Sequence, residues 1–431
     1  MRCSPILTTL AALGFPALAA AEPATEVHGT AEPTLLDTTE PRDASGTAWQ
    51  PDSTPMFMWH ARAGGWQLGL HTSSFFGYDS HPGTRGDADP ISINWLMGMA
   101  RHSVGSGSLT FRGMLSTEPF TMPDNGYPLL LQTGEMFEGE PLHDRQHPHD
   151  LVMELALLYR QPIADTVGLE LYIAPVGEPA LGPPAYPHRF TAMGDPLAPL
   201  GHHWLDATHI SFEVVTAGVF TRTFKLEGSY FNGREPDDDR THFDDLRFPD
   251  SYSARLSVNP TRDISAQVSW AHLDSPEWLA VDVSIERITA SAAWNRTLAG
   301  GDLGVLAAFG QNNPSMGPTT RAGLVEGTAM FDDTHTVFAR IEALTKSGED
   351  LVLPEEMADE TFGIGALSAG YVYDFHQLGV LVPGIGAVGT LDVVGSTLGD
   401  LYDTRTPWGA MVFVRLRPPV VAMAGHHAHA M

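Results

Sequence analysis

Cysteine is almost absent from this 431-residue chain, which contains only Cys3. One cysteine excludes a disulfide framework and a zinc site built from paired cysteines. Any metal chemistry must therefore use the 19 histidines, the carboxylates or the methionines. Positive charge is also scarce, with 24 Lys and Arg against 52 Asp and Glu and a formal net charge of −28. Such a surface repels phosphate backbones, so we expect no nucleic-acid partner.

Long hydrophobic runs are missing after the first 21 residues. Residues 1–21 are typical of a signal peptide, with Arg2, an apolar stretch and a small-residue cleavage site at its end. Cys3 would be removed with it. No later run reaches the roughly 18 apolar residues of a membrane-spanning helix. An exported chain without such a helix is periplasmic, secreted, or a β-barrel in the outer membrane of a Gram-negative bacterium.

Strand-like alternation begins near residue 55. Ile210, Phe212 and Val214, for example, alternate with Ser211 and Glu213. A period of two is the signal of a β-strand, because successive side chains point to opposite faces. The expected strands span 66–76, 91–101, 107–117, 150–160, 167–174, 208–218, 221–231, 251–259, 263–272, 284–295, 302–311, 320–331, 335–345, 362–373, 377–391 and 408–417.

The lengths of the strands and of their connections distinguish a membrane barrel from a soluble β-sandwich. Strands of about nine to eleven residues are what a tilted membrane strand needs. Short and long connections also alternate along the chain, as they do in outer-membrane barrels. We therefore predict an all-β, closed antiparallel transmembrane barrel of about 16 strands over 55–417, with short periplasmic turns and long outer loops. Residues 22–54 are predicted to be a flexible periplasmic lead and 418–431 a histidine-containing tail, while 56–61 form either another strand or a plug-like lead.

Charged side chains occupy one face of the predicted strands. Charge on a lipid-facing surface is costly, so this face should line the lumen while the apolar face contacts lipid. Free charges there would set the ion preference of a pore, whereas tightly paired charges would close it. The expected lumen-lining residues are Arg112, Glu154, Glu213, Arg255, Arg287 and Arg340.

Two histidine-rich segments, 143–150 and 201–209, lie at the C-terminal ends of the two longest connections. They precede the fourth and sixth expected strands on the same, outer side, so we expect them to converge near the barrel mouth. Neutral imidazole is a common ligand of zinc, copper and nickel, which makes such a divalent metal the expected cofactor. The alternative is that these histidines only hydrogen-bond to Asp144, Asp150 and loop carbonyls and hold the loops folded. The candidate metal ligands are His143, His147, His149, His202, His203 and His209.

Methionines suggest a second, weaker metal hypothesis. Met56, Met58 and His60 alternate before the first strand, and Met97 and Met99 share one strand face. Thioethers bind copper(I). The interpretation we favour is ordinary apolar surface facing lipid.

Four strings resemble a family of uncharacterised bacterial exported proteins that are predicted to be outer-membrane barrels. They are GYPLLLQTGE at 126–135, DRQHPHDL at 144–151, HHWLDATHI at 202–210 and FNGREPD at 231–237. The resemblance extends over most of the chain after residue 55. It implies the barrel architecture and carries no activity.

The sequence favours an outer-membrane channel or passive transporter for small solutes or metal ions. Its partners would be membrane lipid and those solutes, with the barrel monomeric or trimeric. One alternative is an outer-membrane metal-dependent hydrolase with Glu135 or Asp150 as base, although no Gly-x-Ser-x-Gly motif occurs and an enzyme is less favoured. Another is a surface protein that binds metal without transport.

Overall fold

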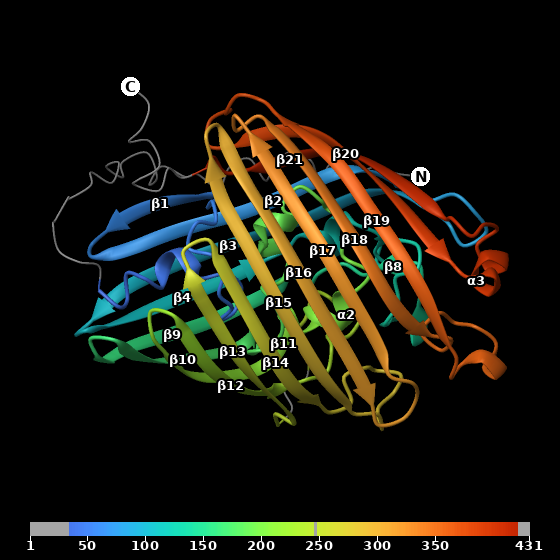
Figure 1. The fold of residues 1–431 in the computed structure, drawn as a ribbon, viewed down its shortest axis with the longest axis horizontal. Helices are drawn as coiled ribbons and strands as arrows, with labels where there is room; N and C mark the ends of the chain where they lie inside the picture. The colour runs from blue at the N-terminus through green and yellow to red at the C-terminus, as the bar shows by residue number, and fades with distance from the viewer. Residues whose placement is uncertain (1–33, 245–247, 421–431) are drawn as a thin grey trace, which may run out of the picture.

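A single antiparallel β-sheet closes on itself in the computed structural model, which describes residues 34–244 and 248–420. Each barrel strand pairs with its neighbour in the chain, and β2 closes the ring by pairing with both β3 and β21 (Figure 1). Closure gives 16 barrel strands and leaves the ring without a free edge. The barrel strands are β2 (Trp66–Ser80), β3 (Ala88–Val104), β4 (Gly107–Leu115), β9 (Val152–Ala164), β10 (Val167–Gly177), β11 (Ser211–Phe220), β12 (Phe224–Asn232), β13 (Ser251–Thr261), β14 (Ile264–Leu273), β15 (Ile285–Leu298), β16 (Gly301–Pro314), β17 (Thr320–Phe331), β18 (His335–Ser347), β19 (Thr361–Asp374), β20 (Val382–Val394) and β21 (Trp408–Arg417).

A seventeenth strand, β1 (Met58–Ala63), extends the pairing at the seam of the barrel, where the first and last barrel strands, β2 and β21, meet. It pairs with the first part of β2, from Trp66 to His71, whereas β21 pairs with the later part of β2, from Ser74 to Ser80. β1 therefore covers the stretch of β2 that β21 does not reach. The segment at 56–61 is thus largely a strand, shifted by two residues.

The connections alternate in length, as predicted. One end of the barrel carries short turns, and the other carries long loops, the longest being 116–151 and 178–210. Among the described residues, no helix has the length and apolar character to cross a membrane. The loops contain short elements: α1 (Glu118–Thr121), β5 (Tyr127–Pro128), β6 (Glu135–Phe137), β7 (Glu140–Leu142), β8 (Arg145–Gln146), α2 (His202–Leu205) and α3 (Ser396–Leu401), with 3₁₀ turns η4 (Tyr186–His188), η5 (Phe190–Ala192), η6 (Ala207–His209) and η7 (Glu355–Met357). A further 3₁₀ turn, η3 (Glu40–Arg42), precedes β1.

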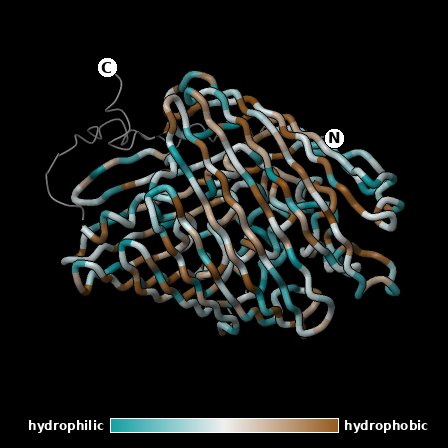
Figure 2. Tube along the Cα trace, in the orientation of Figure 1, coloured by the Kyte–Doolittle hydropathy of each residue, from teal (hydrophilic) through white to brown (hydrophobic). Residues whose placement is uncertain are grey.

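The outer face of the barrel is apolar. Leu226, Ile341 and Val412 are each 61% exposed although they lie within strands, and polar side chains alternate with such residues along the chain (Figure 2). An exposed apolar belt of this kind is what a lipid-facing surface requires.

β3 departs from the predicted arrangement of faces. The alternation suggested that its apolar side faces lipid, yet Ile91, Ile93, Trp95 and Met97 are buried, while Leu96 between them is exposed. The prediction is wrong for this strand because the barrel interior is not water-filled here. Protein segments pack against β3 from inside, so apolar side chains are stable on its inner face.

The loop 178–210 folds into the barrel and crosses its interior. Its backbone amides bind Ser229 of β12, Ser269 of β14 and Glu342 of β18, and its Asp195 accepts a hydrogen bond from Ser368 of β19. These strands lie far apart around the ring, so the loop touches several sides of the wall. In Figure 1 its helix α2 lies within the barrel.

The loop 116–151 joins the same interior packing. Leu130 of this loop, Trp204 of α2 and Phe338 of the wall belong to one buried apolar cluster. Lys346, on β18, donates hydrogen bonds to the Leu131 carbonyl and to Thr133. The two long loops therefore fill the long-loop half of the lumen, and residues 187–193 of the loop 178–210 extend toward the short-turn end.

The segment 34–57 occupies the interior near the short-turn end. Asp43 accepts two hydrogen bonds from Arg160 at 2.6 and 2.8 Å, and Lys225 donates to the Thr47 carbonyl. The sequence predicts a flexible lead over 22–54, but residues 34–54 are folded against the wall. Residues 22–33, the predicted signal peptide at 1–21 and the tail residues 421–431 lie outside the described part of the chain.

Candidate metal centre

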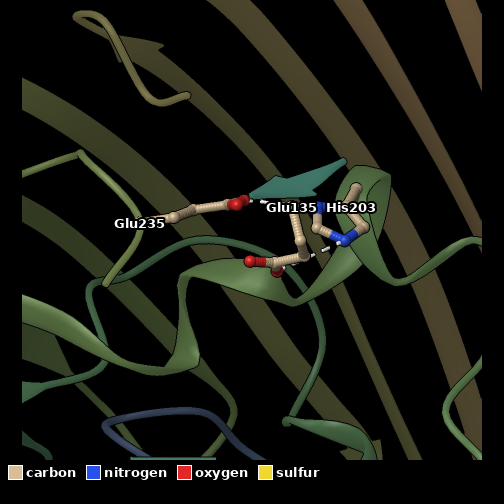
Figure 3. A group of neighbouring side chains, drawn as sticks. All are labelled: Glu135, His203 and Glu235. Atoms are coloured by element: carbon tan, nitrogen blue, oxygen red, sulfur yellow. Dashed lines mark hydrogen bonds and ion pairs between the residues drawn. The ribbon is translucent and has the colours of Figure 1, made fainter. Parts of the chain in front are cut away.

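A cavity of about 330 Å³ opens at the long-loop end of the barrel. Glu135 of β6, His203 of α2 and Glu235 of the loop after β12 line it and point toward one another (Figure 3). One ligand atom from each residue lies within 4.8 Å of the others. The cavity thus brings together three segments that are far apart in the sequence.

Glu135 is the central residue of this cluster. Its Oε1 lies 2.7 Å from His147 Nε2 and 3.6 Å from His203 Nε2. The Nδ1 atom of His203 faces Glu235 Oε1 at 3.2 Å. The Nε2 atom of His203 is buried and has no hydrogen-bond partner among the described residues. Two imidazoles and two carboxyl groups are a ligand set that suits zinc and related divalent ions.

The electrostatics of the cluster keep both histidines and Glu135 in the protonation states that bind a metal ion. Burial lowers the pKa of His147 and of His203 to about 4, so both imidazoles are neutral at neutral pH. Burial alone would raise the pKa of Glu135, but His147, His203 and Arg240 outweigh it and lower that pKa to about 2. Burial and the adjacent Glu135 raise the pKa of Glu235 well above its usual value. A bound divalent cation would relieve the repulsion between the two carboxyl groups and release the Glu235 proton.

Arg240 connects this cluster to Asp150. Its guanidinium lies 3.6 Å from Glu135 and 3.3 Å from Asp150. Burial raises the pKa of Asp150 to about 7. Asp150 and Glu135, the two bases considered for a hydrolase, thus share one arginine; Asp150 pairs with Arg240 and does not reach the open cavity.

Three further predicted ligands continue the cluster inward. The ring centroids of His203 and His202 are 5.4 Å apart, those of His202 and His209 5.2 Å, and those of His209 and His149 5.5 Å. His149 Nδ1 contacts Glu118, and His202 Nδ1 contacts Asp206 at 2.8 Å. These histidines are hydrogen-bonded in the interior, but the carboxylates that they contact are Glu118 and Asp206 and not Asp144 or Asp150. The two histidine-rich segments do meet, from the cavity at the long-loop end, where His147 and His203 both face Glu135, inward to His149 and His209.

His143 lies apart from the other predicted ligands. It contacts Asp144, which also binds Arg85 and Tyr402. No contact among the described residues joins it to Glu135 or to the other five histidines. The positive φ of Asp144, 57°, turns the chain between His143 and the segment that enters the cluster.

Glu235 is the candidate ligand that sequence analysis did not single out in any role, whereas Glu135 was considered only as a base. It begins an acidic run, EPDDD, which looks like a solvated outer loop. Its carboxyl group is nevertheless directed to His203 in the cavity. The run alone contains no signal for this, because the contact depends on where the loop folds.

The predicted lumen charges lie inside the barrel with partners from the wall or loops. Five of the six are buried. The sixth, Glu213, is half-buried at a register shift of β11, with a φ of 54°. The contacts are Arg112–Glu154 at 2.8 Å, Arg255–Glu227 at 3.2 Å, Arg340–Glu326 at 3.2 Å and Arg287–Asn312 at 2.8 Å. These charges hold the interior together and do not line an open pore.

Comparison with solved structures identifies the class of fold. Salmonella typhi OmpF, in a complex with daunomycin, has a TM-score of 0.50 at 10% identity, with 83% of this chain and 100% of that chain covered. OmpT of Vibrio cholerae gives 0.46 at 9%, covering 83% and 98%, and the anion-selective porin from Comamonas acidovorans gives 0.45 at 11%, covering 82% and 99%. No protein-family model and no curated protein matches the chain. The chain therefore has the closed, 16-stranded fold of outer-membrane porins, which confirms the predicted fold class.

Proposed function

We propose that this protein is an outer-membrane transport protein for divalent transition-metal ions, which binds them at Glu135, His147, His203 and Glu235 before they pass inward. The observation that carries this proposal is the convergence of Glu135, His203 and Glu235 on a cavity of about 330 Å³ at the long-loop end, with His147 2.7 Å from Glu135. Export by the signal peptide at 1–21 is part of the same proposal.

The packed interior requires a gated path and not an open pore. The segment 34–57 is held by polar contacts, such as Arg160 to Asp43 and Asn295 to Thr54 at 2.6 Å, and by two small apolar clusters that contain Trp49 and Phe57. None of its residues belongs to a barrel strand; the segment only leads into β1, which begins at Met58. Polar contacts exchange with water at small net cost, so this segment can leave the wall without opening the sheet. This supports 34–57 as the movable part.

The metal site is tested by titrating Zn²⁺ into the detergent-purified full chain. At nearly constant volume, Glu135→Gln replaces the charged carboxylate with a weaker, neutral amide ligand, and His203→Gln removes an imidazole. We expect at least a tenfold loss of affinity, about 1.4 kcal/mol or more. His143→Gln is the matched control, since His143 lies in the same loop but outside the cluster, and it should bind as the wild type does. Equal affinity in all four proteins would overturn the site.

Transport is tested by Zn²⁺ entry into vesicles that contain the barrel and a zinc-sensitive dye. The double variant Asp43→Asn and Asp52→Asn weakens the contacts of the segment 34–57 with Arg160 of β9 and Asn259 of β13. It should admit Zn²⁺ several times faster than the wild type, while Asp165→Asn in an exposed turn should not. Folded protein is quantified first by its gel mobility without heating. Absence of entry through correctly folded double variant would contradict gated transport.

A further inference from the structure

A second cavity, of about 150 Å³, lies inside the short-turn end of the barrel. Five methionines and three histidines line it. Five of these eight residues, Met58, Met97, Met99, His71 and His188, are here called the Met/His pocket; the other three are Met56, Met193 and the exposed His60. It shares no lining residue with the cavity at the long-loop end. The Met97 and Met99 side chains were expected to face lipid; that expectation is wrong, since Met97 is buried and both line this interior cavity.

Strand register places four of these residues on one inner face. Met58 of β1 lies opposite His71 of β2, and His71 lies opposite Met97 of β3. Residues directly opposite each other in an antiparallel sheet have side chains on the same face, with Cβ atoms about 4.5–5.5 Å apart. Met99 follows two residues after Met97 and shares its face. The seam strand β1 is thus required to complete the row.

Gly69 makes room for the pocket. It lies opposite Met99 in the register and lines the same cavity. A Cβ at this position would lie 3.0 Å from the terminal methyl of Met58 and 3.2 Å from that of Met99. The ends of the two thioether side chains therefore meet above Gly69, where any other residue would displace them.

His188 enters the pocket from the opposite side, on the loop that crosses the lumen. Its ring centroid lies 6.1 Å from that of His71 and 4.6 Å from that of Trp95. Its Nε2 atom is buried and has no hydrogen-bond partner among the described residues. A buried imidazole nitrogen without a partner is costly, and a ligand that accepts its lone pair would remove that cost.

The chemistry of the lining selects the type of ligand. Thioethers bind soft cations and interact weakly with hard ones, and neutral imidazole accepts a soft cation as well. The carboxylates of Glu40 and Asp43 also line the cavity, but Asp43 is already bound to Arg160. Three sulfur and two nitrogen donors, without a thiol, suit a monovalent d¹⁰ ion.

We propose that the Met/His pocket is a binding site for copper(I), held by the thioethers of Met58, Met97 and Met99 with the imidazoles of His71 and His188. This site is independent of the divalent-metal site proposed above, because the two use different residues at opposite ends of the lumen. A small cavity of about 50 Å³, lined by both His71 and His149, lies between the pocket and the histidine cluster.

The test is competition for copper(I) between the full-length protein in detergent and a chromogenic copper(I) chelator, under anaerobic, reducing conditions. Cys3→Ser in every variant removes the one thiol. The wild type should take up one tightly bound copper(I), with sulfur neighbours detected by X-ray absorption. Met97→Leu with Met99→Leu keeps the apolar volume and should weaken binding at least tenfold and reduce the sulfur signal.

Met411→Leu is the matched control, since Met411 is equally buried in the wall but does not line the pocket, and it should bind as the wild type does. Gly69→Ala should also weaken binding, because the added methyl group would displace the ends of Met58 and Met99. Failure of the wild type to compete for copper(I), or unchanged binding and sulfur signal in the Met97, Met99 double variant, would overturn the proposal. Zn²⁺ binding should be unchanged in that variant, and copper(I) binding unchanged in Glu135→Gln, so either site can fail alone.

Discussion

At the scale of single residues, buried ion pairs dominate the interior of this barrel. Asp374 shows the principle: it bonds Arg415 at 2.8 Å and Arg417 at 2.6 Å, and all three are buried. A buried charge is tolerable only with its partner, because the interior offers no water to replace it. The alternation of the sequence places such charges on the inner face, but it does not pair them.

Removing the shared carboxylate of Asp374 should therefore strongly destabilise the barrel. Asp374→Asn leaves Arg415 and Arg417 without a counter-charge, and we expect a loss of about 3–5 kcal/mol in the free energy of unfolding. Urea unfolding of the refolded barrel in lipid measures it. Asp165→Asn, in an exposed turn, should change stability by less than about 0.5 kcal/mol. A comparable loss of stability in both variants would show that the ion pairs of Asp374 do not account for the destabilisation.

At the scale of elements, the segment 34–57 depends on a buried acid of the neighbouring loop. Glu178 follows β10, and a Cβ on Gly46 would lie 2.7 Å from its Cβ, so the two backbones touch. Burial raises the pKa of Glu178 to about 8; Arg255, Ser45 and Arg112 oppose this shift, and Glu154 adds to it. The carboxyl is thus neutral while the segment is packed.

This predicts a pH dependence of the packing. Below about pH 4.5, Glu178 is protonated in both the packed and released states, so it has no effect. Between about 4.5 and 8, only the packed state keeps the proton, and packing weakens as the pH rises; above 8 the penalty is constant. Hydrogen exchange of residues 34–57, compared with Glu178→Gln at each pH, should show wild-type protection falling roughly tenfold or more from pH 5 to 8, since each pKa unit is a factor of ten.

Glu178→Gln cannot ionise, so its protection should be independent of pH after correction for intrinsic exchange rates. Glu138→Gln, at an exposed loop position, should follow the wild type. A pH dependence that persists in Glu178→Gln would assign the effect to another group.

At the scale of the whole molecule, the apolar belt determines where the barrel is stable. Val325, in the middle of β17, is 50% exposed, and Val281, in the loop between β14 and β15, is 51% exposed. Their exposures are alike, so lipid contact is the main difference between the two positions. A charge at the centre of a bilayer costs energy that a charge in a solvated loop does not.

Val325→Lys should therefore lower the stability of the barrel in lipid vesicles by about 2–4 kcal/mol. Val281→Lys should leave it nearly unchanged. Unfolding titrations of both variants in the same vesicles make the comparison. Equal losses at the two positions would contradict the placement of this belt in the membrane.

The sequence by itself determined the strands, their order and the alternation of turns with loops. These features are local: the period of two and the length of each connection are visible within a few dozen residues. They suffice for the number of strands, and the expected range 408–417 coincides with β21. They also place Arg112 and Arg340 on the inner side, because a charged side chain is unstable on the side that faces lipid.

Only the tertiary structure decided what fills the lumen and which residues share a site. Trp204 reaches Thr320, and Glu235 reaches His203, through contacts that no local pattern records. The same packing reversed the expected role of β3, since an inner face covered by protein accepts Met97 as readily as lipid would. Chain segments meet inside the barrel according to the net free energy of burying them together, and that quantity belongs to the closed ring as a whole.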